Sequence, residues 1–232
     1  MVTKSGGILV DRVIAKAFAT NCWILSGAKS GQALIVDPGI GDPYLHQAVL
    51  DRCHELSLHP VAVFITHGHM DHTFSVLPLC QGEGIPALIH SSDRDLLAHP
   101  ERALSAAARA LIPPGTNFAE PEEVVELTDQ LRYSIAGLDL IFHHTPGHTP
   151  GSTIALVSQE FLISGDVLFA GSIGRTDLPR GSLSDMEQSL REKIIPLSDE
   201  LQVLPGHGQT TTIGRERAGN PYLKSAMEGR LG

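Results

Sequence analysis

The sequence predicts an α/β fold with two layers of β-sheet. Short β-branched runs separated by Gly, Ser and Lys turns open the chain, as in an antiparallel meander. Strand-like and helix-like segments then alternate along residues 42–97, which is typical of βα units. Five strand-like runs follow between residues 124 and 164, and they predict a second, antiparallel layer.

The first layer and its helices are predicted from residues 8–97. Strands are expected at residues 8–15, 21–25, 33–36, 61–66 and 87–89. Helices are expected at residues 42–56, 74–79 and 91–97, where apolar positions recur at helical spacing. The turn Asp37-Pro38-Gly39 ends the third strand, and Asp42 is the expected N-cap of the first helix.

The second layer and its helices are predicted from the remainder of the chain. Strands are expected at residues 124–127, 131–135, 138–144, 153–158, 160–164 and 201–204. Ser184 is the expected N-cap of a helix that ends near Lys193. The tail is expected to be helical, with a break at Asn220-Pro221.

The amino-acid composition argues against several classes of function. Apolar residues make up 42% of the chain and charged residues 19%, which predicts a folded core rather than disorder. A net charge of −9 argues against a nucleic-acid partner, because phosphate binding needs clustered Lys and Arg. Residues 1–12 show neither a secretory signal nor a membrane span, so we expect a cytoplasmic protein with no membrane partner. Cys22, Cys53 and Cys80 lack paired spacing and are expected to be buried free thiols.

The most informative motif follows the apolar run at residues 61–65. Residues 66–72 read Thr-His-Gly-His-Met-Asp-His, with three imidazoles and a carboxylate close together. Residues two apart converge from a loop and not from one helix face, so His67 and His69 are expected to point together. Asp71 and His72 then begin the next helix, where they can reach a second cation. The motif therefore indicates half of a two-metal hydrolytic site.

Three more potential ligands follow downstream. His148, Asp166 and His207 each lie in a glycine-flanked loop just past the end of a predicted strand. Imidazole nitrogen and carboxylate oxygen suit zinc, iron or manganese, and the absence of thiolate ligands disfavours a purely structural zinc site. The sequence has no Gly-x-Ser-x-Gly nucleophile elbow, so no protein nucleophile is expected.

These motifs resemble those of the metallo-β-lactamase fold hydrolases, most closely the glyoxalase II (hydroxyacylglutathione hydrolase) branch and its short bacterial members. The resemblance covers nearly the whole chain. Besides the histidine motif, it rests on residues 36–39, 145–152, 165–169, 172–177 and 205–208. It implies a four-layer α/β/β/α sandwich, with two mixed sheets face to face and helices outside.

The resemblance also implies a role for each potential ligand. The first ion would be held by His67, His69 and His148, and the second by Asp71, His72 and His207. Asp166 would bridge the two ions, and Asp71 and Asp166 would be the catalytic carboxylates. The expected cofactors are two divalent metal ions, with zinc first and iron or manganese as alternatives.

The implied activity is hydrolysis of a small-molecule thioester, S-(2-hydroxyacyl)glutathione such as S-lactoylglutathione. A hydroxide held between two cations is expected to attack the acyl carbon, because coordination lowers the pKa of water toward about 7. Thiolate is a good leaving group, so general acid help is not needed.

Two other activities of the same fold stay open. A mononuclear iron persulfide dioxygenase would use His67, His148 and Asp166, whereas the loop Gly206-His207-Gly208 favours a second metal and hydrolysis. A lactonase would use the same hydroxide. The long glyoxalase II enzymes carry an extended helical C-terminal region, and 25 residues follow His207 here, so a thiol carrier other than glutathione also stays open.

Other residues allow two interpretations. Asp37 either only forms its turn or also orients a ligand histidine. Arg175 either binds an anionic substrate group or pairs with Asp177. Five tail residues either approach the pocket or pack the last helix; they are Arg215, Arg217, Asn220, Pro221 and Tyr222. Structural roles are expected for His90, His143 and His144.

We expect residues 1–232 to form a single domain. Within it, residues 98–123 combine an alanine-rich helix with Pro113-Pro114-Gly115 and are expected to form an excursion over the active-site face. Residues 213–232 form the short C-terminal helical tail. The sequence does not reveal the oligomeric state.

Overall fold

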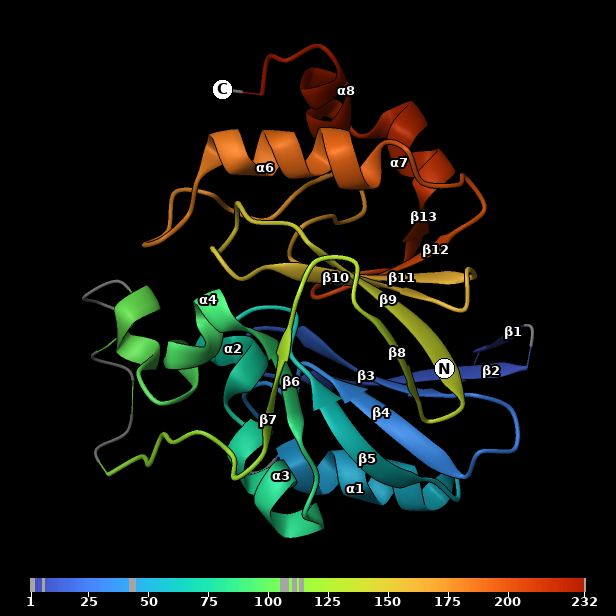
Figure 1. The fold of residues 1–232 in the computed structure, drawn as a ribbon, viewed down its shortest axis with the longest axis vertical. Coiled ribbons are helices and arrows are strands. Elements are labelled where there is room, and N and C mark those ends of the chain that lie inside the picture. The colour runs from blue at the N-terminus through green and yellow to red at the C-terminus, as the bar shows by residue number, and fades with distance from the viewer. Residues whose placement is uncertain are drawn as a thin grey trace.

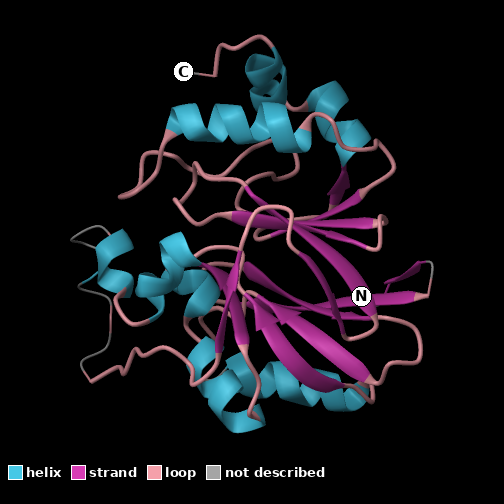
Figure 2. Cartoon of the chain, viewed as in Figure 1, coloured by secondary structure: helices cyan, strands magenta, loops and turns pink. Residues whose placement is uncertain are grey.

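The protein folds into four layers, with two β-sheets face to face and helices on both outer faces (Figures 1 and 2). The computed structural model describes residues 3–5, 7–41, 45–104, 109, 112 and 115–231. Helices α1 and α3 cover one sheet, whereas α6, α7 and α8 cover the other. The predicted α/β/β/α sandwich is therefore confirmed.

The first sheet has seven strands in chain order. They are β1 (Thr3–Ser5), β2 (Ile8–Ala15), β3 (Thr20–Ser26), β4 (Gln32–Val36), β5 (His59–Phe64), β6 (Ala87–His90) and β7 (Val124–Leu127). Strands β2 to β4 form the predicted antiparallel meander, β1 adds an antiparallel strand that the sequence did not predict, and β4 to β7 run parallel. Parallel pairing needs long crossovers, and the segments between these strands supply them.

Strand β7 corrects one prediction, because residues 124–127 were expected in the second layer. Val124 pairs with Ala87 of β6 in parallel register, so β7 is the edge strand of the first sheet. The chain then crosses to the other sheet between Leu127 and Arg132.

The helices of the first half pack on the outer face of this sheet or lie near its loop edge. They are α1 (Leu45–Glu55), α2 (Met70–Thr73), α3 (Val76–Glu83), α4 (Ser91–Arg94), η1 (Asp95–Leu97) and η2 (Pro100–Ala103). Leu45, Val49 and Leu79 bury their side chains in one cluster with the outer face of β5. The predicted N-cap Asp42 and most of the alanine-rich segment, with Pro113 and Pro114, lie outside the described residues.

The second sheet has six strands in the order β13-β12-β11-β10-β9-β8. Their bounds are β8 (Arg132–Ile135), β9 (Leu138–His144), β10 (Thr153–Val157), β11 (Phe161–Gly165), β12 (Gln202–Pro205) and β13 (Thr211–Thr212). The sheet is mixed, as the family resemblance implied: β8 to β11 pair antiparallel, and β11 and β12 pair in parallel. A helical crossover separates these two strands and permits this pairing.

The helices of the second half are α6 (Leu183–Ser189), the π-type turn η3 (Leu190–Ile194), α7 (Ile213–Gly219) and α8 (Pro221–Met227). The N-cap of α6 is Ser182 and not the predicted Ser184, because Ser182 is extended and its Oγ accepts a hydrogen bond from Asp185 N. Asn220 caps α8, and Pro221 occupies its first turn, which explains the break predicted in the tail.

The main core lies between the two sheets. Phe64 of β5 and Phe142 of β9 meet edge to face, with ring centroids 4.9 Å apart. The three cysteines are free and buried, as predicted. Among the described residues, no helix is long and apolar enough to cross a membrane.

The Phe142→Ala substitution should destabilise the fold strongly. Phe142 is fully buried, so its removal leaves a cavity between the sheets and should lower the free energy of unfolding by about 3–5 kcal/mol. Urea unfolding followed by circular dichroism measures this change. The exposed aromatic Tyr222, replaced by Ala, is the control and should change stability by about 0.5 kcal/mol or less. Equal effects of the two substitutions would contradict this placement of the core.

Candidate metal centre

The loops that carry the predicted ligands lie close together because the strands before them run in the same direction within each sheet. Strands β4 and β5 are parallel, so Asp37 and the histidine motif leave the first sheet at one edge. In the second sheet β9, β11 and β12 share one direction, so the loops of His148, Asp166 and His207 also leave at a common edge. The seven predicted ligands are thereby brought to one place.

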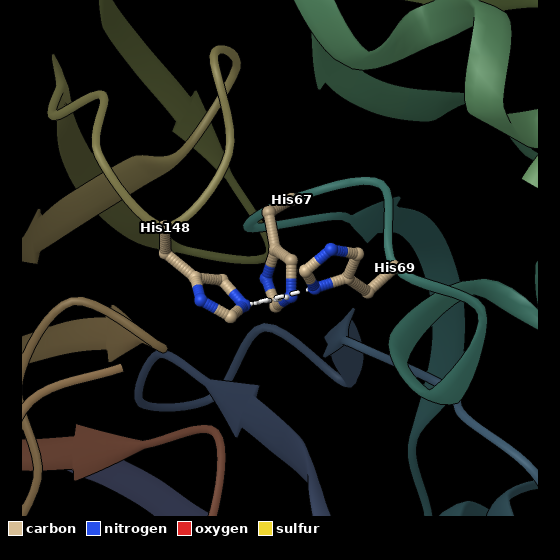
Figure 3. A group of neighbouring side chains, drawn as sticks. All are labelled: His67, His69 and His148. Carbon is tan, nitrogen blue, oxygen red and sulfur yellow. Dashed lines mark hydrogen bonds between the residues drawn. The ribbon is translucent and has the colours of Figure 1, made fainter. Parts of the chain in front are cut away.

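The first donor set consists of His67, His69 and His148 (Figure 3). Nε2 of His148 lies 2.9 Å from Nδ1 of His69 and 3.2 Å from Nε2 of His67. At Zn–N distances of about 2.0–2.1 Å, two nitrogens of a tetrahedral site lie about 3.3 Å apart. The spacing of these three nitrogens therefore fits a shared ion.

The second donor set consists of Asp71, His72 and His207. Nε2 of His207 lies 3.1 Å from Nε2 of His72 and 3.3 Å from Oδ2 of Asp71. Asp71 and His72 come from α2, as the sequence predicted, and His207 follows β12.

Asp166 lies between the two sets. Its Oδ2 is 3.5 Å from Nε2 of His148 in the first set and 3.5 Å from Nε2 of His207 in the second. Its Oδ1 is 3.5 Å from Nε2 of His72 and is buried with no hydrogen-bond partner among the described residues. A buried carboxylate oxygen without a donor is costly, and a cation would satisfy it. The residues present therefore fit two metal ions.

Most of these histidines are oriented through their second ring nitrogen. Nδ1 of His148 donates to the carbonyl oxygen of Arg175 at 2.7 Å, and Nδ1 of His207 bonds the carbonyl oxygen of Phe18 at 3.1 Å. Nδ1 of His67 lies 3.1 Å from the hydroxyl of Thr66. Each bond leaves the other nitrogen facing its donor set.

Asp37 serves both of its predicted purposes. It follows β4 in the left-handed region, with φ of 50°, so it does form the turn. Its carboxylate also accepts bonds from Thr66 N at 2.8 Å and Thr66 Oγ1 at 2.7 Å, and it lies 2.9 Å from Nδ1 of His72. Asp37 therefore orients His72.

A second group of residues, which the sequence did not reveal, holds the His207 loop. Nδ2 of Asn21 donates to the carbonyl oxygens of Pro205 and Gly208, and Nε1 of Trp23 donates to Pro205 at 3.0 Å. Trp23 is also part of the buried core between the sheets. No motif marks these two residues, because their partners are backbone atoms far away in the sequence.

The Arg175 side chain forms a bidentate ion pair with Asp177, with distances of 2.9 and 2.8 Å, and both side chains are exposed. This is one of the two alternatives that the sequence left open, and a role in substrate binding stays a prediction. His90 and His144, expected to be structural, stack with ring centroids 3.9 Å apart.

Position 206 requires a glycine because its backbone passes close to two of the donor side chains. A Cβ atom at Gly206 would lie 2.2 Å from Oδ1 of Asp166 and 2.7 Å from Cε1 of His72. Any side chain there would displace these two groups.

Burial keeps His67 and His69 of the first donor set neutral. It lowers the pKa of His67 well below its ordinary value, and His72 and His148 lower it further. Burial also lowers the pKa of His69 to about 3, with His148 acting in the same direction. Neutral imidazole is the form that binds metal, so these rings are ready as ligands.

The second set behaves differently because carboxylates surround it. Burial acts to lower the pKa of His72, but the carboxylates of Asp166, Asp71 and Asp37 outweigh burial and raise the pKa to about 10. Burial likewise acts to lower the pKa of His207, and the hydrogen bond to Asp71 reverses the shift. Before metal binds, His72 therefore carries a proton at neutral pH.

The two sets also differ in exposure. His67, His69 and His148 are buried, whereas the side chains of Asp71 and His207 are 24% and 27% exposed. Solvent and small molecules therefore reach the centre from the side of the second set.

A family model described as the Metallo-beta-lactamase superfamily matches residues 15–207. The chain belongs to the metallo-β-lactamase superfamily. A relative in Bacillus subtilis named a probable metallo-hydrolase is 34% identical over 83% of this chain and 87% of its own length, in agreement with the clustered His and Asp side chains.

Curated relatives and solved metallo-β-lactamase fold structures extend over most of the chain. An uncharacterized protein of Mycobacterium tuberculosis is 39% identical over 94% of this chain and 98% of its own length. Hydroxyacylglutathione hydrolase GloC of Haemophilus influenzae is 34% identical over 93% of this chain and 98% of its own length. The BLEG-1 B3 metallo-β-lactamase structure covers 92% of this chain and 99% of its own, with 34% identity and a TM-score of 0.81. TTHA1623 in a di-iron-bound form covers 92% and 100%, with 30% identity and a TM-score of 0.75.

Metal binding to this metallo-β-lactamase fold protein should release protons. His72, with its pKa raised to about 10, must lose its proton to become a ligand, so affinity for the second ion should rise with pH between about 6 and 10, up to tenfold per unit. Calorimetric titration with Zn²⁺ in two buffers of different ionisation enthalpy counts the protons. In a His207→Ala variant the remaining ion should bind with a weaker pH dependence, because His67 and His69 are already neutral. Affinity for the second ion that does not change with pH would contradict this assignment.

A Gly206→Ala substitution should weaken binding of both ions, because its Cβ would push Asp166 away from its position between the two sets. Metal content after dialysis, measured by mass spectrometry, should fall below that of the parent protein. Gly219→Ala is the matched control, since a Cβ at Gly219 would meet no atom within 4 Å. Full metal content in the Gly206→Ala variant would show that the close approach does not matter.

Proposed function

We propose that this protein is a binuclear metallohydrolase that cleaves a thioester, with S-(2-hydroxyacyl)glutathione such as S-lactoylglutathione as the substrate class. The proposed ligands are His67, His69 and His148 for one ion, Asp71, His72 and His207 for the other, and Asp166 for both. Two divalent ions are proposed, with zinc first and iron or manganese as alternatives, since all three accept nitrogen and oxygen donors.

The position of Asp166 carries the proposal. One carboxylate oxygen stands at equal distance, 3.5 Å, from a histidine of each donor set. A site for a single ion would not need a complete second set around His207. This observation favours the binuclear hydrolase over a mononuclear iron dioxygenase.

Two ions bound by these residues would supply a hydroxide at neutral pH and would stabilise negative charge on the acyl oxygen. The chain itself orients the donors through Asp37 and the carbonyl groups of Arg175 and Phe18. The partly exposed side chains of Asp71 and His207 give the substrate an approach. The chain need not supply a general acid, because a thiolate leaves without protonation.

The similarity to GloC supports the choice of substrate. That relative is named a hydroxyacylglutathione hydrolase, and it is similar over almost all of both chains. Arg175 is proposed to contact an anionic group of the substrate, which would require it to exchange its exposed partner Asp177. Exposed ion pairs of this kind are weak, so the exchange costs little.

The test is a panel of thioesters that includes S-lactoylglutathione, with free thiol release as the readout. The metal-loaded protein should cleave at least one member. Asp166→Asn should weaken both ions and remove nearly all turnover, and His207→Ala should release one ion selectively. Asp139→Asn is the control, because this carboxylate is exposed and bonds Ser134 on β8, away from the donor sets.

Three outcomes would contradict the proposal. Oxygen uptake with glutathione persulfide, without thioester cleavage, would identify the dioxygenase alternative. Cleavage of lactones alone would identify a lactonase. Normal metal content and turnover in the Asp166→Asn variant would refute the bridging role.

A further inference from the structure

A buried carboxylate outside the seven proposed ligands links two of the ligand loops. Asp93 lies in α4, just after β6, and its side chain is fully buried. Its Oδ2 accepts hydrogen bonds from Gly68 N at 2.8 Å and from Thr149 Oγ1 at 2.6 Å. Its Oδ1 accepts a bond from Gly151 N at 2.9 Å. One side chain thus receives three donors from two loops.

Both loops carry members of the first donor set. Gly68 stands between His67 and His69, and Thr149 directly follows His148. The position of each imidazole depends on the backbone that carries it. The bonds to Asp93 tie the two loops together and so fix the distance between them. The convergence of the three histidine nitrogens depends on that distance.

The residues around the Asp93 carboxylate pack closely against it. A Cβ atom at Gly151 would lie 2.6 Å from both Cβ and Cγ of Asp93, so the backbone approaches the side chain as closely as glycine allows. Ser152 fixes the same turn, because its Oγ accepts a bond from Thr149 N and contacts Thr149 Oγ1 at 2.8 Å. Hydrogen bonds to a carboxylate are stronger than neutral ones, and here they are shielded from water.

The second donor set has a different support. Asp37 contacts His72 directly, whereas the bonds of Asp93 reach only the loops of the first set. Asp37 also bonds Thr66, whose hydroxyl lies 3.1 Å from Nδ1 of His67, so Asp93 differs from Asp37 in bonding no residue of the second set.

We propose that Asp93 is a positioning residue for the first donor set and determines the affinity of the ion held by His67, His69 and His148. Asp93 acts through the backbone of the ligand loops and does not touch the ion itself. This inference rests on the metal binding in the proposed function and not on the thioester substrate.

The test measures each ion separately with Co²⁺. A His207→Ala background keeps the first set, and a His69→Ala background keeps the second. Adding Asp93→Asn leaves fewer acceptors for Gly68 N and Thr149 Oγ1, because the amide nitrogen donates and does not accept. Co²⁺ affinity, measured by competition with a chelating indicator, should fall about 10–100-fold in the His207→Ala background. It should stay unchanged in the His69→Ala background. The visible absorption bands of bound Co²⁺ should also shift only in the first background.

Two further variants complete the design. Thr149→Val removes one donor and keeps the carboxylate, so it should weaken the first ion in the same direction but less. Asp95→Asn is the matched control, because this neighbouring carboxylate pairs with Arg102 and Arg180 near the surface and should leave both affinities unchanged. If circular dichroism shows that Asp93→Asn does not fold, Thr149→Val decides the question.

Equal losses in both backgrounds, or no loss in either, would overturn the role of Asp93. If neither background binds Co²⁺, the metal assignment fails and the role of Asp93 fails with it. A protein that binds Co²⁺ and responds selectively to Asp93→Asn, but cleaves no thioester, would refute only the proposed substrate.

Discussion

The metal centre depends on holding two β-sheets at a fixed distance along one edge. Each sheet supplies loops from strands of one direction, and neither sheet alone supplies a complete donor set. Contacts between the sheets therefore determine the geometry. Asn21 N at the start of β3 donates to Gly206 O at 2.7 Å, and Thr20 pairs with His207 as an isolated bridge. These bonds connect the first sheet directly to the loop that carries the proposed ligand His207 of the second.

Much of the centre could be predicted from the sequence, because ligand chemistry is concentrated in short motifs. His67, His69, Asp71 and His72 are neighbours in the chain, and the other three ligands stand in glycine-flanked loops after recognisable strands. The supporting residues could not be predicted. Asp93 bonds groups 25 and 58 residues away in the chain, and nothing in its local sequence distinguishes it from a surface carboxylate.

The two errors in the fold have different causes. The placement of residues 124–127 in the second layer is an error of strand partner, which depends on long-range packing. Local patterns identified most of the described strands and their order in the antiparallel runs, but not the partner of residues 124–127. The N-cap of α6 was wrong by two residues because Ser182 and Ser184 are equally good capping residues, and backbone geometry decides between them.

The wide separation of the ligands along the chain has a consequence for how the protein matures. His67 and His207 are 140 positions apart, and β12, which precedes His207, is among the last strands of the chain. While a ribosome is still making the protein, the emerged portion holds the motif at 67–72 without its later partners. Binding of both proposed ions therefore has to wait until translation has passed His207.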